Sequence, residues 1–304
     1  MTEGTLSGMR FSLVGPGRVG SSVARWLLAR GAALGAVARR RGSRLPGWAV
    51  AAGARAARLD TVDSAGDDLL LLAVPDPELP AVAATLASRP QARVALHVSG
   101  RLDAESLAPL RSGGSAVGSL HPLRAFPRPL PSLTVARRTF LALEGDAAAL
   151  ALAGRIAAAL PAPHAEIASA LKPLYHLAAT LAAGGAVTVL GGAVDLHRRA
   201  AMPPAAAAGL VELARGALAA VDAAQPVAAI TGPVARGESA YLGQLAALRE
   251  AFPALHPLAV LIALEALRQL AGEGPLSTSQ VALRSALRDI CGESAFLDPL
   301  LAWV

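Results

Sequence analysis

A glycine-rich turn near the start of the chain constrains the fold more than any other feature of the sequence. The turn has the spacing G-x-G-x-x-G. It directly follows a predicted short buried strand, residues 10–14, and it opens a segment with helical periodicity, residues 19–30. In such a strand–turn–helix unit the glycines permit a tight turn and let the backbone approach a pyrophosphate, whose charge lies at the helix N-terminus. We therefore predict a dinucleotide site at Gly15, Pro16, Gly17, Arg18, Val19 and Gly20.

The first half of the chain alternates between segments typical of strands and segments typical of helices. Residues 69–74, LLLLAV, form a continuous apolar run, as in a parallel strand that is covered on both faces. The strands predicted in this way are residues 10–14, 33–38, 69–74, 94–98, 116–120, 139–143 and 164–167. This order predicts an α/β fold, a Rossmann-type doubly wound and mainly parallel sheet.

The second half of the chain lacks strand patterns. Its predicted helices are residues 169–200, 204–224, 238–250, 255–273 and 277–291, separated by proline and glycine. We therefore predict two domains, a dinucleotide-binding domain over residues 1–168 and an all-helical domain for substrate binding and dimerisation over residues 169–304.

The residues after the predicted second strand indicate which dinucleotide binds. A site that prefers NAD places an acidic residue there to bind the ribose 2′-hydroxyl, whereas this chain has Arg39 and Arg40. Guanidinium groups can pair with a 2′-phosphate, which favours NADP. Because ligands of such sheets bind beyond the carboxyl ends of the strands, we also expect Val74, Pro75 and Ser99 to contact the cofactor.

The basic residues offer candidates for catalysis. Lys172 is the only lysine in the chain, and a lysine, unlike an arginine, can release its proton near neutral pH when it is desolvated. His176 lies four residues later, on the same face of a helix. His121 follows another predicted strand, where it either faces the nicotinamide or caps a loop. Thr231 and Arg236 belong to a predicted loop, residues 231–237, in which Arg236 either holds an anionic substrate group or is merely exposed.

Composition argues against several other classes of protein. The net charge of +6 comes from scattered arginines without interleaved aromatic residues, which argues against nucleic-acid binding, and no cluster of histidine, cysteine and carboxylate suggests a metal. A single cysteine, Cys291, and a start without a secretion signal favour the cytoplasm. Residues 177–194 carry no charge but consist mostly of alanine and glycine, so we expect a buried core helix or a homodimer helix rather than a membrane span.

Taken together, these motifs resemble the short-chain, Rossmann-like oxidoreductases that carry a C-terminal helical domain of unknown function. That group is similar to the 6-phosphogluconate dehydrogenase, prephenate dehydrogenase and pyrroline-carboxylate reductase superfamily. The resemblance rests on the glycine turn, Ser99-Gly100, residues 119–123, Lys172-x-x-x-His176 and residues 231–237.

The resemblance also implies roles for individual residues. Prephenate dehydrogenases carry a similar His-Pro, which implies an acid/base role for His121. Hydroxyacid dehydrogenases carry a similar lysine followed four residues later by asparagine, which implies a catalytic Lys172 with His176 in place of the asparagine. Relatives usually have a Ser-Asn pair soon afterwards, where this chain has Ala183-Gly184-Gly185 and lacks that amide.

Two functions follow as hypotheses. The first is an NADP-dependent oxidoreductase that transfers a hydride between nicotinamide and a small carbonyl, imine or hydroxyl substrate between the domains. Lys172 or His121 would move the proton, His176 would orient it, and Arg236 would hold the substrate. The second is a non-catalytic NADP-binding sensor or partner protein, which the missing amide favours and the retained lysine opposes.

Overall fold

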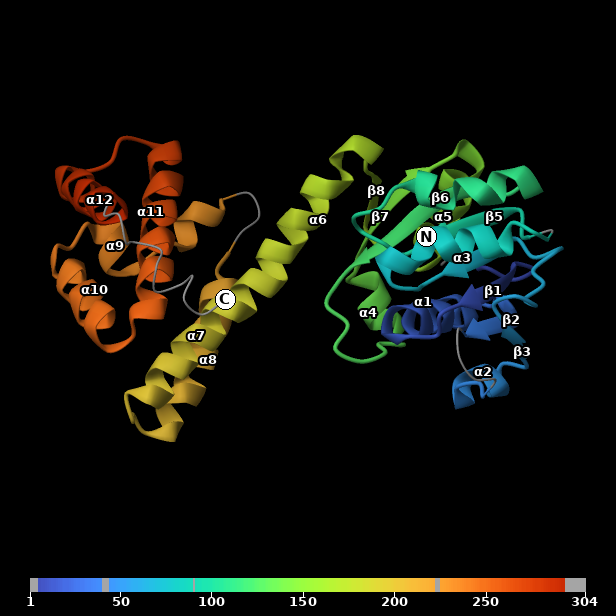
Figure 1. Ribbon diagram of the computed structural model, residues 1–304, viewed down its shortest axis with the longest axis horizontal. Helices are drawn as coiled ribbons and strands as arrows, with labels where there is room; N and C mark the ends of the chain where they lie inside the picture. Colours follow the sequence, from blue (N-terminus) through green and yellow to red (C-terminus); the bar gives the residue numbers. More distant parts are fainter. Residues whose placement is uncertain (1–4, 40–43, 90, 222–224, 293–304) are drawn as a thin grey trace. The chain divides into compact units, whose positions relative to one another are not determined.

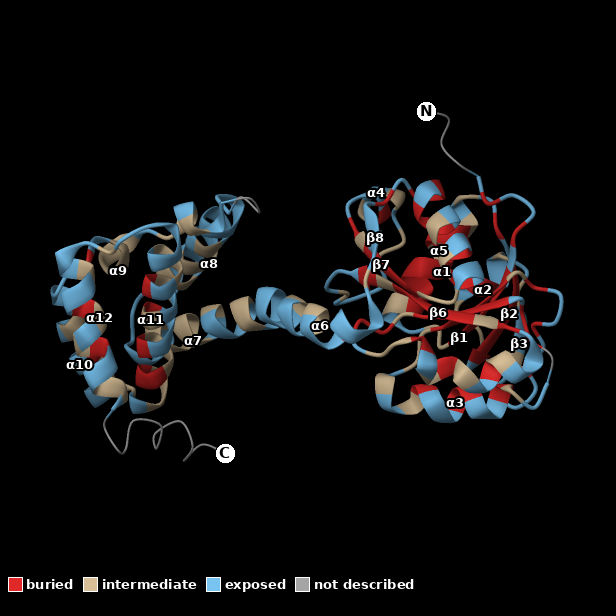
Figure 2. Cartoon of the chain, turned by 90° about the horizontal axis from the view of Figure 1, so that it is seen from above, coloured by how far each residue is buried: buried red, intermediate tan, exposed pale blue. Residues whose placement is uncertain are grey.

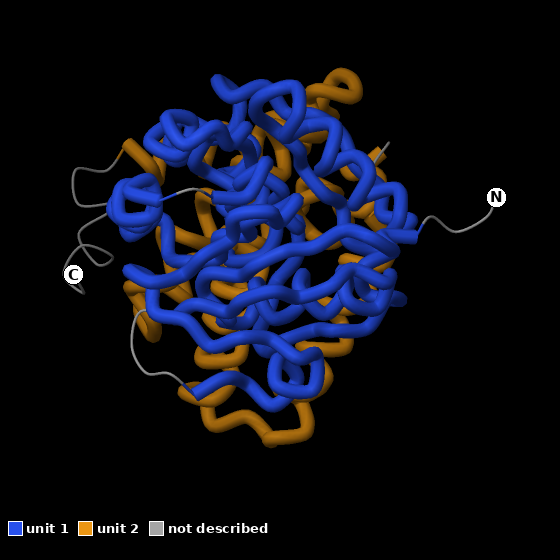
Figure 3. The backbone as a smooth tube through the Cα atoms, turned by 90° about the vertical axis from the view of Figure 1, so that its right-hand side faces the viewer, with its two compact units in different colours: residues 1–184 blue, residues 185–304 orange. Residues whose placement is uncertain are grey.

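The computed structural model describes residues 5–39, 44–89, 91–221 and 225–292. The chain divides into two compact units, residues 1–184 and residues 185–304, which Figure 3 colours separately. Each unit has its own arrangement of helices and strands.

The first unit is built on one eight-stranded sheet (Figure 1). Its strands are β1 (Arg10–Val14), β2 (Ala33–Arg39), β3 (Arg55–Arg58), β4 (Leu69–Leu72), β5 (Val94–His97), β6 (Ala116–Leu123), β7 (Phe140–Gly145) and β8 (His164–Glu166). Their order is β3-β2-β1-β4-β5-β6-β7-β8, and every neighbouring pair is parallel except β6 and β7. The predicted fold class is confirmed.

Helices cover both faces of this sheet, so its central strands, such as β4 and β5, are buried on both sides (Figure 2). The helices of the unit are α1 (Arg18–Ala29), α2 (Gly47–Ala51), α3 (Leu79–Leu86), α4 (Leu133–Arg137), α5 (Ala147–Ala159) and α6 (Lys172–Thr180). Phe11 and Leu13 of β1 pack with α1 and α5, whereas Val14 packs with α3 on the opposite face. Two covered faces explain why the strands are continuous apolar runs.

Strand β6 is longer than the sequence predicted, and its extension matters for the site. It runs on through His121 because it pairs with the antiparallel strand β7 along its full second half. In this register Ser119 lies opposite Glu144 and His121 opposite Ala142. The only strand that sequence reasoning missed among the described residues is β3, whose sequence Arg-Ala-Ala-Arg is short, polar at both ends and largely exposed.

The described part of the second unit is all-helical, as predicted. Its helices are α7 (Ala186–Arg199), α8 (Pro204–Ala219), α9 (Gly232–Arg236), α10 (Ala240–Ala251), α11 (His256–Glu273) and α12 (Thr278–Cys291). A small core joins α10, α11 and α12 through Leu245, Val260, Leu267 and Leu283. The predicted loop over residues 231–237 is wrong in part, because Gly232–Arg236 forms the short helix α9.

The apolar helical stretch over residues 177–194 is not buried in the protein core. Leu177, Leu181 and Val187 have exposed fractions of 53%, 65% and 71%, so the expectation of a buried core helix is wrong. By length and composition alone, Ser169–Arg199 and Pro253–Glu273 could each cross a membrane, with mean hydropathies of 1.8 and 1.3. The dimer alternative and the boundary at residue 168 stay predictions.

Candidate functional site

The loop after β5 is fixed by a buried histidine. His97 is fully buried, its Nδ1 accepts a hydrogen bond from the Ser99 backbone N–H at 3.1 Å, and its Nε2 lies 3.0 Å from the Asp103 carbonyl oxygen. Burial, with the nearby Lys172 charge, lowers the pKa of His97 to about 4, so the ring is neutral near pH 7. The Ser99 hydroxyl in turn accepts from the backbone N–H groups of Arg101 and Leu102. This loop therefore has a single well-defined path.

Lys172 is the centre of a buried polar network at the start of α6. Its side chain is 2% exposed, and its Nζ donates to Ser119 Oγ at 2.6 Å and to the Ser99 carbonyl oxygen at 3.3 Å. The Ser119 hydroxyl donates a hydrogen bond to Glu144 Oε2 at 3.1 Å, and that oxygen lies 3.7 Å from Lys172 Nζ. A serine therefore bridges a buried lysine and a buried carboxylate.

Glu144 is held from two further directions. Its Oε1 accepts from the Ala104 backbone N–H at 3.1 Å and from Ser169 Oγ at 2.9 Å. Burial lowers the pKa of Lys172 from its usual value, and the charge of Glu144 opposes that effect. The network joins the loop after β5, the middle of β6, strand β7 and the start of α6, so it fixes where α6 begins on the sheet.

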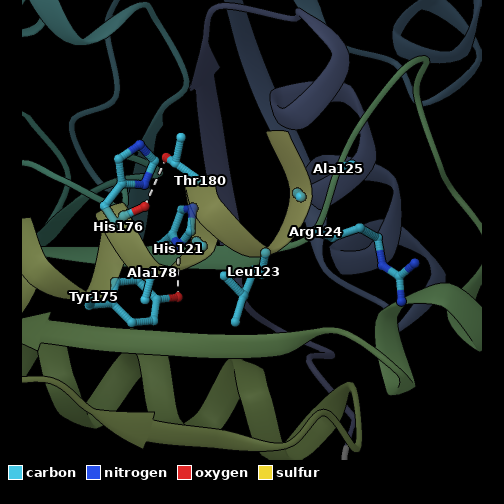
Figure 4. A pocket seen from close by; sticks show the side chains of 11 residues that line it. His121, Leu123, Arg124, Ala125, Tyr175, His176, Ala178 and Thr180 are labelled. Carbon is cyan, nitrogen blue, oxygen red and sulfur yellow. Dashed lines mark hydrogen bonds between the residues drawn. The ribbon is translucent and has the colours of Figure 1, made fainter. Parts of the chain in front are cut away.

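A cavity of about 560 Å³ opens beside this network, within the first unit (Figure 4). Its walls are formed by His121, Leu123, Arg124, Ala125, Tyr175, His176, Ala178, Ala179, Thr180, Ala182 and Ala183. Lys172 is not among these residues. The predicted catalytic residues therefore separate into His121 and His176, which face the cavity, and Lys172, which lies behind its wall.

Three aromatic side chains meet at one end of the cavity. His121 Nδ1 and the Tyr175 hydroxyl are 2.9 Å apart, and the two rings meet edge to face at a centroid distance of 5.6 Å (Figure 4). The His176 ring lies 5.9 Å from the His121 ring at an interplanar angle of 79°. His176 Nδ1 is buried and has no hydrogen-bond partner among the described residues. A buried polar atom of this kind calls for a ligand or water as its partner.

Gly100 makes room for these rings. A Cβ atom at Gly100 would lie 2.6 Å from His176 Nδ1 and 2.8 Å from His121 Nε2, closer than a carbon and a nitrogen can approach. Both nitrogens therefore lie against Gly100, and the two rings can take these positions only because residue 100 has no side chain.

Burial keeps both members of the His121–Tyr175 pair neutral. It lowers the pKa of His121 to about 4, with contributions from His176 and Lys172, and it raises the pKa of Tyr175 to about 12. Between these values a neutral imidazole and a protonated phenol share one hydrogen bond, so one proton of the pair stays free to be donated to a ligand.

The glycine turn forms a second, separate cavity of about 320 Å³ in the same unit. It is lined by Val14, Gly15, Pro16, Gly17, Arg39, Leu59, Ala73, Val74, Pro75, Glu78 and Val82. Gly15 has φ +88°, and a Cβ there would lie 2.5 Å from the Ala73 carbonyl oxygen, so only glycine fits. Gly17 is the N-cap of α1 and leaves the first backbone N–H groups of the helix without a side-chain partner.

These residues fit the pyrophosphate of a dinucleotide, because a glycine cradle and an uncapped helix N-terminus meet at the sheet edge. Arg18, Val19 and Gly20 form the first turn of α1, and three of the residues proposed to contact the cofactor, Arg39, Val74 and Pro75, line the cavity. Arg40 lies outside the described residues. Ser99, another predicted cofactor contact, does not line this cavity. Its hydroxyl accepts a hydrogen bond from the Arg101 backbone N–H, and its carbonyl oxygen accepts one from Lys172 Nζ.

Thr231 and Arg236, the predicted substrate-binding residues, belong to the second unit. Thr231 is the N-cap of α9, without a side-chain hydrogen bond to the helix, and Arg236 ends that helix and pairs with Glu238. Neither residue lines either cavity.

Sequence reasoning missed Tyr175, Glu144 and the role of Gly100. Tyr175 lies between Lys172 and His176 in the sequence. Because residues three apart share one face of a helix, its spacing from Lys172 could have indicated that it belongs to the site. Glu144 could have been noticed as a carboxylate at a buried position of an apolar strand, FLALEG.

Two family models match the chain. The model of a Rossmann-like domain matches residues 4–122, and the model of a domain of unknown function, DUF2520, matches residues 139–264. No curated protein matches the chain in sequence.

Several solved structures share the fold. Protein TM1727 from Thermotoga maritima is 22% identical, with a TM-score of 0.67 over 84% of this chain and 97% of that one. An imine reductase from Myxococcus stipitatus in complex with NADP+ is 16% identical, with a TM-score of 0.57 over 96% and 99%. The Plasmodium falciparum pyrroline carboxylate reductase with NADP bound is 12% identical, with a TM-score of 0.56 over 87% and 98%.

The Lys172–Glu144 pair leads to a prediction on stability. Glu144→Gln leaves a buried lysine charge without its counter-charge, so we expect a loss of about 3 kcal/mol in the free energy of unfolding, measured by urea denaturation. Glu105→Gln, which removes an exposed carboxylate paired with Arg111, should cost less than about 1 kcal/mol.

The double variant Glu144→Gln, Lys172→Met removes both charges and should regain part of the loss. If the double variant is no more stable than Glu144→Gln alone, the buried pair does not explain the cost.

Proposed function

We propose that this chain, a Rossmann-like domain followed by a DUF2520 domain, is an NADP-dependent oxidoreductase acting on a small carbonyl, imine or hydroxyl substrate. The observation that carries the proposal is the neutral His121–Tyr175 pair at an alanine-lined cavity, in the same unit as the glycine cradle. Two solved structures with this fold hold NADP, which supports the same cofactor here.

Bound at Gly15, Gly17 and Arg39, NADPH would supply the hydride. The chain's own residues then supply and hold the proton. With the Tyr175 hydroxyl donating to His121 Nδ1, the ring proton of His121 is on Nε2, the nitrogen that does not contact Tyr175. His121 Nε2–H donates its proton to the oxygen or nitrogen of the reduced substrate, and Nδ1 takes the phenol proton of Tyr175 in exchange. Water then returns a proton to His121 Nε2, leaving hydroxide, and Nδ1 gives the phenol proton back to Tyr175.

Lys172 acts in this proposal as a positioning residue rather than as the proton donor. Its three hydrogen positions face Ser119, Ser99 and Glu144, and its side chain is 2% exposed. By fixing the start of α6 it holds Tyr175 and His176 over His121. The built and neutral His121–Tyr175 pair also favours catalysis over a non-catalytic sensor, because binding alone needs no proton donor at that point.

Removing the phenol tests this proton path. We expect Tyr175→Phe to lower kcat with acetophenone or 2-methyl-1-pyrroline by about 100-fold or more, with NADPH affinity unchanged, because a general acid typically contributes ~10²–10⁴-fold. Tyr241→Phe, in the second unit, is the matched control.

The same pair predicts the pH profile. Since the pKa values of His121 and Tyr175 are about 4 and about 12, kcat/KM of the unaltered protein should be level from pH about 5.5 to about 9. A bell-shaped profile centred near neutrality would contradict the pair. Tight NADPH binding without turnover of any carbonyl or imine would support the sensor instead.

Arg39 tests the choice of cofactor. We expect NADPH to bind at least about tenfold more tightly than NADH, about 1.4 kcal/mol, and Arg39→Ala to remove most of that difference, measured by cofactor fluorescence. Arg55→Ala, at the opposite end of the neighbouring strand β3, should leave the preference intact. Equal affinities of the unaltered protein for both cofactors would rule out NADP specificity.

The exposed apolar side of α6 and the residues after it support a homodimer. Leu174 and Leu181 are each 65% exposed, and a surface of this kind is usually covered. We expect a dimer by light scattering, and a shift to monomer in the double variant Leu174→Glu, Leu181→Glu. Val50→Glu, at another exposed apolar position, should stay dimeric.

A further inference from the structure

The cavity beside His121 is apolar over most of its wall. Ala178, Ala179, Ala182 and Ala183 form one side, and Leu123 and Ala125 contribute to the other. None of the residues that line it is acidic. At about 560 Å³ the cavity is far larger than a three-carbon acid, and a ligand that fills it must cover the alanine side with an apolar body.

The polar groups of the cavity are gathered at one end. His121, Tyr175 and His176 line this end of the cavity, and His176 Nδ1 has no hydrogen-bond partner among the described residues. Burial keeps His121 neutral, so its ring offers a hydrogen bond and no positive charge. A carbonyl oxygen or imine nitrogen fits such a point.

The one lining residue with a permanent charge, Arg124, does not face this end. Its guanidinium Nε donates to Thr139 Oγ1 at 2.7 Å and its Nη2 to the Arg138 carbonyl oxygen at 3.0 Å. Figure 4 shows the Arg124 side chain extending away from His121, Tyr175 and His176. The cation that lies behind the wall, Lys172, is already paired with Glu144.

We propose that this cavity binds an uncharged ketone or imine with an aryl-sized apolar substituent, and that it discriminates against carboxylate-bearing analogues. The assignment rests on the proposed function and narrows its substrate class. The apolar body covers the alanine side, and the heteroatom lies at the end lined by His121, Tyr175 and His176. A carboxylate beside the reacting carbon would lose its hydration against alanine methyl groups and the neutral His121–Tyr175 pair.

A matched pair of probes tests the proposal by binding. Acetophenone and benzoylformate are both phenyl ketones and differ in carrying a methyl group or a carboxylate beside the carbonyl. Their dissociation constants are measured by calorimetry on the protein saturated with NADP+, in which neither ketone can be reduced. We expect acetophenone to bind at least about tenfold more tightly than benzoylformate.

Variants locate the binding to this cavity. Ala183→Leu fills the alanine side and should weaken acetophenone at least about tenfold, whereas Ala148→Leu, the same change at an exposed position of α5, should have no effect. Gly100→Ala places a Cβ between the two histidine nitrogens and should also weaken acetophenone.

Each outcome has one meaning. The assignment is overturned if benzoylformate binds more tightly than acetophenone, and all the more if Arg124→Gln abolishes the benzoylformate binding. It is also overturned if neither ketone binds. If NADPH and NADP+ fail to bind but acetophenone still binds to the cofactor-free protein and is weakened by Ala183→Leu, the proposed function fails and the ligand class of the cavity stands.

Discussion

A buried lysine–glutamate pair bridged by a serine determines the geometry of this site. Lys172 and Glu144 cannot be desolvated separately without a large cost, so each requires the other and Ser119 between them. Because these three residues come from α6, β7 and β6, satisfying the charges also fixes the first turn of α6 against the sheet. Tyr175 and His176 follow within that turn and the next, which sets them over His121. The need to pair the buried charges of Lys172 and Glu144 thus fixes the positions of Tyr175 and His176 at the cavity.

The local features of the sequence were sufficient for the fold and for the glycine turn. A turn with three spaced glycines between an apolar run and a helix has one common solution, and Gly15, with its positive φ, adopts it. Lys172 could be singled out because it is the only lysine, and His121 because it follows a predicted strand. Composition could not predict the direction of the Lys172 side chain, which contacts Ser119 and Glu144 and does not line the cavity.

The remainder of the site depends on pairing between distant segments. Glu144 meets Ser119 only because β7 runs antiparallel to β6 in one register, and neither the register nor the direction is encoded in six residues of apolar strand. Tyr175 gains its partner in the same way, across 54 residues of chain. The prediction that residues 177–194 form a buried core helix was wrong for a different reason. An uncharged helix on the surface can have the same composition as a buried one, so composition could not distinguish them.

The antiparallel pairing of β6 and β7 also bears on how such proteins can be recombined. The Rossmann-like match ends inside β6, and the DUF2520 match begins just before β7, so the border between the two families runs through one hydrogen-bonded ladder. A fragment cut there would carry β6 as a bare edge strand, open to pairing with other chains. It would keep Ser119 and His121 but lose the carboxylate, the lysine and the phenol that they contact. Swapping helical halves between homologues should therefore succeed only when the crossover lies beyond residue 184, because Ser99 and Gly100 also contact residues of the later segments.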